Sequence, residues 1–452
     1  MIERLRPAIA PAYLFLCLML GGSPQGIWRN AILQLLGAVL IAWAFIERQE
    51  ETLPKSTRNL LIIVAAAILL GLLQLVPLPV AVWSSLPGRE LVMDGYRLLG
   101  LEPVAMPLSL SPYDSISALL ALLPPLGMLA ATLVLRAYKP SWLAASLVAG
   151  TLAGVLLGIL QVSTPGTSWY LYRISNFGVA TGFFANSNHM ASLLLAGLAF
   201  IAALGATFRE QSKDARHRTS VLALAAGGLA VVLIGLLLNR SLAGYGLGLP
   251  VIVASLLLLL GTRSRLARVG AIAACVTSLL AVIILWTSPV GSRMGPDPTG
   301  ASVSSRQEMI AGSVQLLEEF GLAGTGTGTF AKLYPQIENA AEIDRFYVNH
   351  AHNDYLELAI ETGLPGILLV LIFLGWWIHA VWQMLRSPSA DQFAVAGAIV
   401  SAVILLHSLV DYPLRTAAIG AVFAACLALI LQSRKSAKSN SDLRPVRHVV
   451  VG

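Results

Sequence analysis

The sequence HAHNDYLELAIETGLPGILLVLIFLGWWIHAVWQML, residues 350–385, joins a cluster of titratable side chains directly to a long apolar run. The run over residues 364–385 is long enough to cross a hydrocarbon core of about 30 Å as a helix. Similar runs recur along the 452 residues, of which only 12% are charged, whereas a typical soluble protein has about 25%. The sequence therefore predicts an all-α polytopic membrane protein.

We predict about twelve transmembrane helices within a single membrane-embedded domain, residues 1–452. Only helices fit, because backbone groups in lipid must be hydrogen-bonded within their own segment and the alternation typical of barrel strands is absent. The predicted spans are 8–21, 30–46, 59–76, 115–135, 141–162, 188–208, 219–238, 242–260, 269–288, 364–385, 393–410 and 415–432.

The placement of lysine and arginine predicts the orientation of these spans. If the N-terminus is cytoplasmic, 20 of the 30 basic residues lie in cytoplasmic connections and the two tails. Both termini are then cytoplasmic, and residues 433–452 form a basic tail that we expect to be disordered. The net charge of +7 reflects this topology and requires no nucleic-acid partner. The three cysteines all lie in apolar runs, which argues against a disulfide framework or a cysteine metal site.

Two long connections lie on the opposite face. Residues 77–114 are rich in proline and leucine, which suggests a loop at the membrane interface. Residues 289–363 form a larger loop that carries most of the chain's concentrated polarity. Within it, SSRQEMIAGSVQLLEEFG predicts a helix that ends at Gly321. The following GLAGTGTGTF lacks the lysine of a phosphate-binding loop, so we interpret it as a tight backbone path near the substrate.

The histidines before the last long run are candidates for chemistry. We predict a helix that begins near His352 or Asn353, so that Asp354, Glu357 and Glu361 share one face. Carboxylates early in a helix are favoured by its dipole, which is a structural explanation for them. His350 and His352 are two residues apart, but no further ligands with metal-site spacing accompany them, so we predict no metal. A neutral histidine titrates near working pH and suits a general base.

The element His352-Asn353, nine residues and Gly363-Leu-Pro-Gly366 resembles the HN-x9-GxxG signature of the O-antigen ligase and O-antigen polymerase superfamily. Three other stretches add to the likeness. SSRQEM, with Arg306, is similar to the start of the family's loop helix, and LNRSLAG, with Arg240, is similar to its short turn between middle spans. TGFFANSNHMASLL, with Asn186 and Asn188, is similar to its asparagine-bearing entry into a span.

The resemblance implies transfer of a glycan from undecaprenyl diphosphate to an acceptor hydroxyl at the periplasmic face of the bacterial inner membrane. His352 would be the base of an inverting, metal-independent displacement that needs no cofactor. Arg240 and Arg306 would stabilise the charge that develops on the diphosphate. We add Arg415, Asn186, Asn188, Asn353 and His350 as candidates for substrate binding. Asn353 either orients His352 or caps the helix.

The stretch HSLVDYPLR brings Asp411 and Arg415 to the outer end of a span, where we expect a charge pair that is structural before it is functional. His189 and His407 are expected to be packing residues, because they lie at or within spans.

The acceptor stays open at this point. Lipid A-core would make the protein a ligase, a growing lipid-linked polysaccharide would make it a polymerase, and a protein hydroxyl would make it a protein O-oligosaccharyltransferase. A secondary transporter is the alternative from another class. Transporters usually place ionisable groups at the membrane midplane, whereas these spans are almost free of charge.

Overall fold

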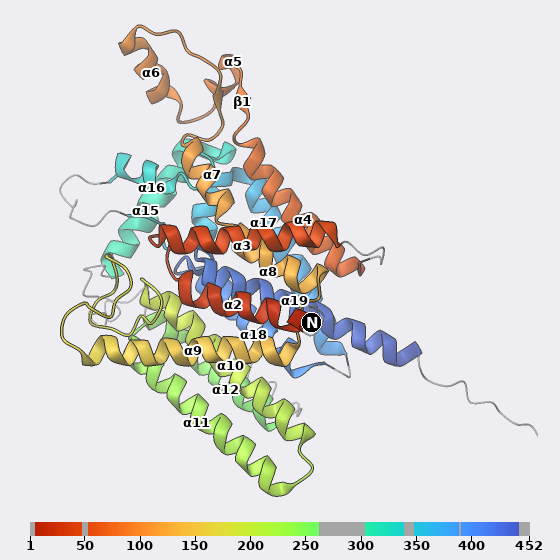
Figure 1. Cartoon of the computed structure of the whole chain (residues 1–452). Helices are drawn as coiled ribbons and strands as arrows, with labels where there is room; N and C mark the ends of the chain where they lie inside the picture. Colours follow the sequence, from red (N-terminus) through yellow and green to blue (C-terminus); the bar gives the residue numbers. More distant parts are fainter. Residues whose placement is uncertain (1–4, 48–52, 262–302, 339–347, 388–389, 443–452) are drawn as a thin grey trace, which may run out of the picture.

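The computed structural model describes residues 5–47, 53–261, 303–338, 348–387 and 390–442; of residues 303–307 and 433–442 it describes only the backbone. The described chain is mainly helical with almost no sheet, which confirms the predicted all-α class. Its long helices lie side by side in a bundle (Figure 1). They are α2 (Ile9–Leu20), α3 (Ile27–Ile46), α4 (Lys55–Leu73), α7 (Pro112–Leu120), α8 (Leu123–Leu129), α9 (Pro140–Ser163), α10 (Ser187–Gln211), α11 (Ala215–Asn239), α12 (Leu242–Leu260), α17 (Asp354–Arg386), α18 (Gln392–His407) and α19 (Ala417–Asp442).

Among the described residues, 8 helices are long and apolar enough to cross a membrane, with α7, α8 and the π-helical turn η2 (Ala130–Val134) combined as one. Three shorter apolar helices lie over Arg6–Leu20, Gln392–His407 and Ala417–Gln432. These helices coincide with the predicted spans, except that the span predicted at 269–288 lies outside the described residues. The count of twelve therefore stays a prediction.

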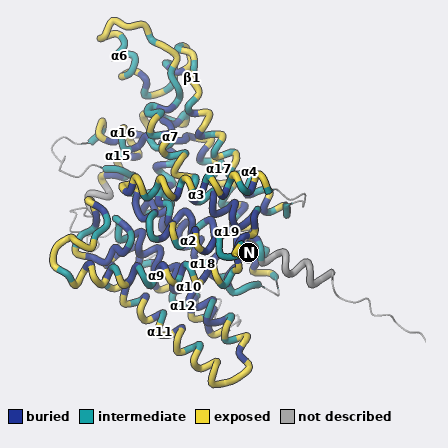
Figure 2. Tube along the Cα trace, viewed as in Figure 1, coloured by how far each residue is buried: buried dark blue, intermediate teal, exposed yellow. Residues whose placement is uncertain are grey.

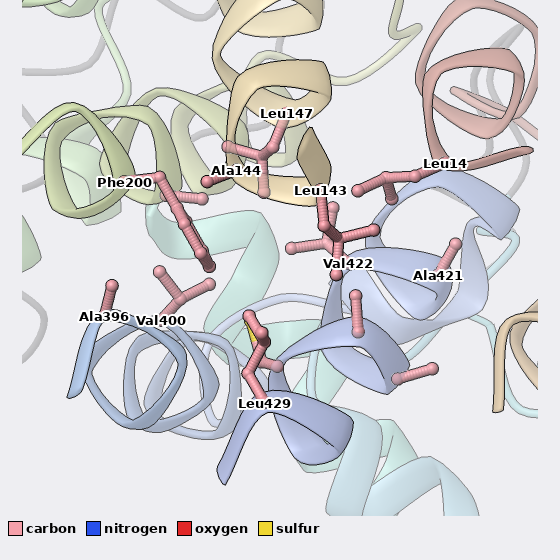
Figure 3. Packing of buried hydrophobic residues seen from close by; sticks show 14 of the residues in the cluster. Leu14, Leu143, Ala144, Leu147, Phe200, Ala396, Val400, Ala421, Val422 and Leu429 are labelled. Atoms are coloured by element: carbon pink, nitrogen blue, oxygen red, sulfur yellow. The ribbon is translucent and has the colours of Figure 1, made fainter. Parts of the chain in front are cut away.

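Helix α10 lies at the centre of the bundle, in contact with α9, α11, α12 and α18. In its membrane window 83% of residues are buried, against 17% in α4, which exposes apolar side chains as a lipid-facing helix does (Figure 2). Figure 3 shows the core in which Leu147 of α9, Phe200 of α10 and Val422 of α19 pack together. The site described below is built on the first turn of this central helix.

The two ends of the bundle differ in character. At one end, Arg6 forms an ion pair of 2.6 Å with Glu47, and Glu210 at the end of α10 accepts a hydrogen bond from Gln392 at 2.8 Å. The start of α2 and the last turns of α19 also lie at this end (Figure 1). The connections that were predicted to be cytoplasmic thus meet one another, and we call the opposite end, where α10 and α17 begin, the site end.

Short helices cover the site end. The predicted loop helix is confirmed as α15 (Val303–Phe320), and Gly321 after it has φ +59°. It is followed by η3 (Gly321–Ala323), α16 (Phe330–Leu333) and η4 (Tyr334–Gln336). Phe320, Phe330 and Leu333 form a second apolar core with Ala351 and Ile360. This core fixes the loop helices against the first turns of α17.

The connection between α4 and α7 projects from the edge of the bundle (Figure 1). It contains the only strands among the described residues, β1 (Pro77–Leu78) and β2 (Met106–Pro107), which pair antiparallel. Between them lie α5 (Val80–Trp83) and α6 (Glu90–Leu99). Its fold depends on buried Trp83, whose indole donates to Val104 O at 2.9 Å.

The C-terminal tail departs from expectation in its first part. Residues 433–442, which belong to the tail predicted to be disordered, continue α19 as helix to Asp442. The remainder of the predicted tail and residues 289–302 of the predicted large loop lie outside the described residues. The division of the chain into one domain with a large loop stays a prediction.

Candidate active site

The signature histidine lies directly before α17. Asn353 caps this helix, because its side-chain oxygen accepts from Tyr355 N and Leu356 N, both at 3.1 Å. Asn353 was predicted either to orient His352 or to cap the helix, and its hydrogen bonds are those of a helix cap. His352 has φ +49°, a left-handed conformation that is uncommon for a residue with a Cβ. The backbone thus turns sharply at the histidine and presents it beside the helix.

The acidic face of α17 converges on Arg415. The guanidinium lies 3.1 Å from Glu361 Oε2, 3.4 Å from Glu357 Oε1 and 3.4 Å from Asp354 Oδ1. All three carboxylates are buried. The predicted alignment of the carboxylates on one face is therefore confirmed, and a single cation from the α18–α19 connection explains it.

The predicted pair of Asp411 with Arg415 is wrong. Burial alone would lower the pKa of Arg415, but Glu357, Glu361 and Asp354 outweigh that effect and raise the pKa above its usual value. The guanidinium is thus a permanent charge that is already balanced by three carboxylates.

Asp411 instead forms the centre of a second cluster. Its carboxylate is fully buried and accepts from the side chains of Asn186 and Asn188, as well as from the Tyr412 backbone at 2.8 Å. His189 Nε2 and His352 Nδ1 each lie 3.6 Å from Asp411 Oδ1. These contacts join the first turn of α10 to the signature histidine.

The donors around Asp411 fix its ionisation. Burial opposes the charged form, but the close contact with His189 and the nearby imidazoles of His352 and His407 outweigh it. The pKa of the Asp411 carboxyl is therefore held well below its usual range. An ionised Asp411 beside His352 would stabilise a proton taken up by that imidazole.

Tyr412 is the aromatic centre around which three histidines pack. The distances between ring centroids are 4.1 Å to His350, 5.0 Å to His352 and 4.9 Å to His189. His350 also forms a contact of 2.8 Å through Nδ1 with Glu357 Oε1. His350 and His352 thus contact different carboxylates, Glu357 and Asp411. Among the described residues, no group of three or more His, Cys, Asp or Glu is arranged to hold a metal ion.

A cavity of about 480 Å³ opens beside these two clusters. Its wall contains the charged residues Glu357, Glu361 and Arg415 together with His350 and Tyr412. The remaining lining residues are Gly22, Ser23, Pro24, Gln25, Ile27, Ala185, Asn186, His189, Gly328, Ala331 and Asn349. His352 contacts Tyr412 behind this wall. The volume lies within the range of ligand sites, about 300–1,000 Å³.

The turn that carries Arg240 is tied to the same cluster. Ser241 Oγ donates to Asn188 Oδ1 at 2.6 Å, and Asn239 Nδ2 donates to Ser187 O at 2.9 Å. Arg240 is the left-handed C-cap of α11, with φ +55°, and its side chain is exposed. These hydrogen bonds hold the turn against α10, and Arg240 does not line the cavity.

Arg306 is the fourth residue of α15, but its side chain lies outside the described residues. The backbone alone brings α15 to the site end, where it packs against α17. The described residues place neither Arg240 nor His352 in the cavity lining. They bring together His350, His352, Asn353, Asn186, Asn188 and Arg415 around Asp411 and Tyr412.

The two glycines of the signature have steric explanations. Gly363 interrupts α17 with φ +61° and ψ −155°, and a Cβ there would lie 2.2 Å from Leu322 O. A Cβ on Gly366 would lie 1.6 Å from Thr362 Oγ1. The glycine-rich loop packs against this kink, since Gly326 N donates to Glu361 O at 2.9 Å. Gly328 at its end lines the cavity.

Several residues at the site were not anticipated. Residues 22–27, between α2 and α3, carry no catalytic motif, so nothing in their sequence points to the cavity that they line. The positions of Tyr412 and Asp411 at the centre of the site depend on tertiary contacts between distant segments, which the sequence does not reveal. The sequence Asn186-Ser-Asn-His189 could have indicated that the start of this helix belongs to the site, since three polar side chains there need hydrogen-bond partners. His407, expected to be a packing residue, is buried with Nδ1 2.7 Å from Ser192 Oγ.

Comparison with protein families gives a match for part of the chain. Residues 215–371 match the family described as O-antigen ligase. No curated protein matches the chain. The matched residues contain Arg240, Arg306 and the complete HN-x9-GxxG element, which are the features that carried the resemblance in the sequence. The chain therefore has the helices of a multi-pass membrane protein, and its residues 215–371 are similar to the O-antigen ligase family.

Proposed function

We propose that this protein transfers a glycan from undecaprenyl diphosphate to an acceptor hydroxyl at the periplasmic face of the bacterial inner membrane, with both termini in the cytoplasm. The observation that carries the proposal is the O-antigen ligase match, which spans Arg240, Arg306 and the signature histidine. The clustering of polar side chains at one end of an apolar bundle supports it. A transporter would need such groups near the bundle's middle.

In the proposed reaction, His352 accepts the proton of the acceptor hydroxyl while its oxygen attacks the anomeric carbon of the donor. The bond from that carbon to the diphosphate oxygen breaks, and undecaprenyl diphosphate leaves with the electron pair. A single displacement of this kind inverts the anomeric configuration. Asp411, 3.6 Å from His352 Nδ1, stabilises the imidazolium that forms.

Arg240 and Arg306 are proposed to stabilise the charge on the departing diphosphate, which is the task that metal-bound enzymes give to a divalent ion. Arg240 suits it because its side chain is exposed and no ion pair holds it within the described residues. Arg415 is less suited, since three carboxylates already balance its charge. Its proposed role is to hold the acidic face of α17 in place.

The test is glycan transfer by membrane-inserted variants. We expect His352→Ala to lower the transfer rate by about 10²–10⁴-fold and Arg240→Ala or Arg306→Ala by about 10²–10³-fold. Arg97→Ala removes an exposed arginine of α6 and is the control for the loss of positive charge. Full transfer by the His352 variant overturns the assigned base, and loss of transfer in the presence of a chelator overturns the metal-independent mechanism.

The acceptor defines the branch within this proposal. Deletion of the gene in the source cell separates the branches by the glycans that accumulate. Loss of long chains from lipid A-core indicates a ligase, single-repeat products indicate a polymerase, and loss of glycan from proteins indicates a protein O-oligosaccharyltransferase.

A further inference from the structure

The cavity at the site end has an acidic wall. Glu357 and Glu361 line it, and the only cation among its described lining residues is Arg415. Arg415 also pairs with Asp354 behind the wall at 3.4 Å. Three carboxylates therefore share one guanidinium, which leaves no unpaired arginine in this wall to attract phosphate oxygens. A diphosphate group needs cations that are not already paired with carboxylates.

Glu361 in this wall carries a carboxylate oxygen that has no hydrogen-bond partner among the described residues. Glu361 is 1% exposed, and its Oε2 receives both hydrogen bonds from Arg415 at 3.1 Å. Its Oε1 is buried and has no hydrogen-bond partner among the described residues. A buried acceptor without a donor is costly, so the arrangement favours a ligand that brings an O–H or N–H group.

The neighbouring groups are those that bind a sugar ring. His350 is held through Nδ1 by Glu357 at 2.8 Å and lines the same cavity. Tyr412 offers an aromatic side chain within ring-contact distance of His350 and His352. Hydroxyl-rich ligands match convergent carboxylate, imidazole and amide groups, whereas a polyprenyl tail or a diphosphate does not.

We propose that the cavity wall of Glu361, Glu357 and His350 binds a sugar of the acceptor through its hydroxyl groups and that the donor's diphosphate lies outside this cavity, toward Arg240. The inference rests on the proposed transferase function and deepens it. Tyr412 connects the two parts, because its ring packs against both the cavity histidine and the proposed base. The Tyr412 ring thereby connects a sugar bound in the cavity with His352, whose role is to take the proton of the acceptor hydroxyl.

The experiment uses the full-length protein in proteoliposomes, with carrier-linked glycan and acceptor glycolipid extracted separately from source cells that lack the gene. Inorganic pyrophosphate serves as the probe of the diphosphate site. Glu361→Gln removes the negative charge of the carboxylate that is proposed to bind the sugar hydroxyl. We expect it to raise the KM for the acceptor glycolipid about tenfold, while the inhibition constant of pyrophosphate changes little. Arg240→Ala is expected to weaken pyrophosphate inhibition.

A second variant keeps the ion cluster intact. Ala331→Trp fills the cavity from α16 and is expected to raise the KM for acceptor without weakening pyrophosphate inhibition. Gln336→Trp, at an exposed position of the adjacent η4, is the matched control for bulk and is expected to leave both constants unchanged. If donor and acceptor prove to be the same glycolipid, its KM rises in both cavity variants and the pyrophosphate constant stays fixed.

Two results overturn the assignment. Weaker pyrophosphate inhibition in Ala331→Trp would put the diphosphate in the cavity, and an unchanged acceptor KM in both cavity variants would exclude the acceptor from it. Absence of transfer by the unchanged protein is a different failure, because it removes the proposed function and the acceptor subsite with it.

Discussion

Arg415 has the most demanding environment of any described side chain at the site, since three buried carboxylates depend on it. In low dielectric surroundings an unpaired carboxylate pays the full cost of its lost hydration. The arginine fork can serve several oxygens at once, which a lysine ammonium cannot do in the same geometry. The acidic face of α17 is therefore tolerated only because this residue faces it.

Arg415→Ala is expected to destabilise the protein by about 3–5 kcal/mol, because it leaves buried charges without a partner. Arg415→Lys should recover part of this loss. The free energy of unfolding in lipid–detergent micelles provides the measurement, and Arg97→Ala is the control, since it breaks an exposed ion pair with Asp94. A loss no larger than that of the control would show that the carboxylates do not need the guanidinium.

Asp411→Asn is expected to destabilise by about 1–3 kcal/mol, because the new amide donors would face those of Asn186 and Asn188. The lowered pKa of Asp411 fixes the pH dependence of this loss. A group with a depressed folded pKa contributes its full stability above its unfolded pKa of about 3.9.

The difference in stability between unchanged protein and Asp411→Asn should accordingly stay constant from pH 8 to pH 5. It should begin to shrink only below about pH 4, as the carboxyl of the unfolded chain gains its proton. Unfolding measured across this range checks the sign, and a difference that falls between pH 8 and pH 6 would contradict the low pKa.

At the scale of elements, α17 combines two helical segments with different tasks. The segment before Gly363 presents carboxylates to the site, and the segment after it is an apolar helix of the bundle. The backbone of the glycine-rich loop fills the kink between them, where no side chain has room. The signature spacing therefore fixes the distance from the histidine to this kink.

Gly363→Ala is expected to cost at least about 1–3 kcal/mol, because alanine cannot adopt φ +61° without strain and its Cβ would meet the Leu322 carbonyl. Gly375→Ala lies on the same helix with nothing within 4 Å of the new Cβ, so it should be neutral or stabilising. Thermal unfolding of the two variants gives the comparison. Equal melting temperatures would mean that the kink carries no steric constraint.

The sequence allowed the helices to be predicted, because apolar length and helix-ending residues are local signals. Hydropathy located α10 and α17, and Asn353 and Gly363 marked the start and the kink of α17. The partners of polar side chains could not be predicted in the same way. Asp411 and Arg415 are four residues apart, which suggests a pair, yet packing of α10 and α17 on opposite sides sends each to different partners.

At the scale of the whole molecule, the bundle places the two polar clusters of the site, around Asp411 and around Arg415, at one end of α10. This helix has 25 residues, so at about 1.5 Å per residue it separates the site from the Glu210–Gln392 contact by most of a membrane's thickness. The arrangement agrees with the charge-based topology, in which the basic connections share one face.

Cysteine labelling tests this topology in intact cells. In a variant without the native cysteines, Leu322→Cys at the site end should react with a membrane-impermeant maleimide added to permeabilised outer membranes. Lys213→Cys, exposed between α10 and α11, should react only after the inner membrane is opened. Labelling of Lys213→Cys alone would invert the proposed orientation.

The cavity wall draws on two parts of the chain. Gly328, Ala331 and His350 belong to the stretch shared with O-antigen ligases, whereas residues 22–27 and Asn186 lie outside it. The residues of the shared stretch and the lining residues outside it can consequently change at different rates during evolution. A family that keeps the first set and exchanges the second could retain one reaction while it adapts to new cell-surface polymers, and grafting residues 22–27 between homologues offers a route to redirect it.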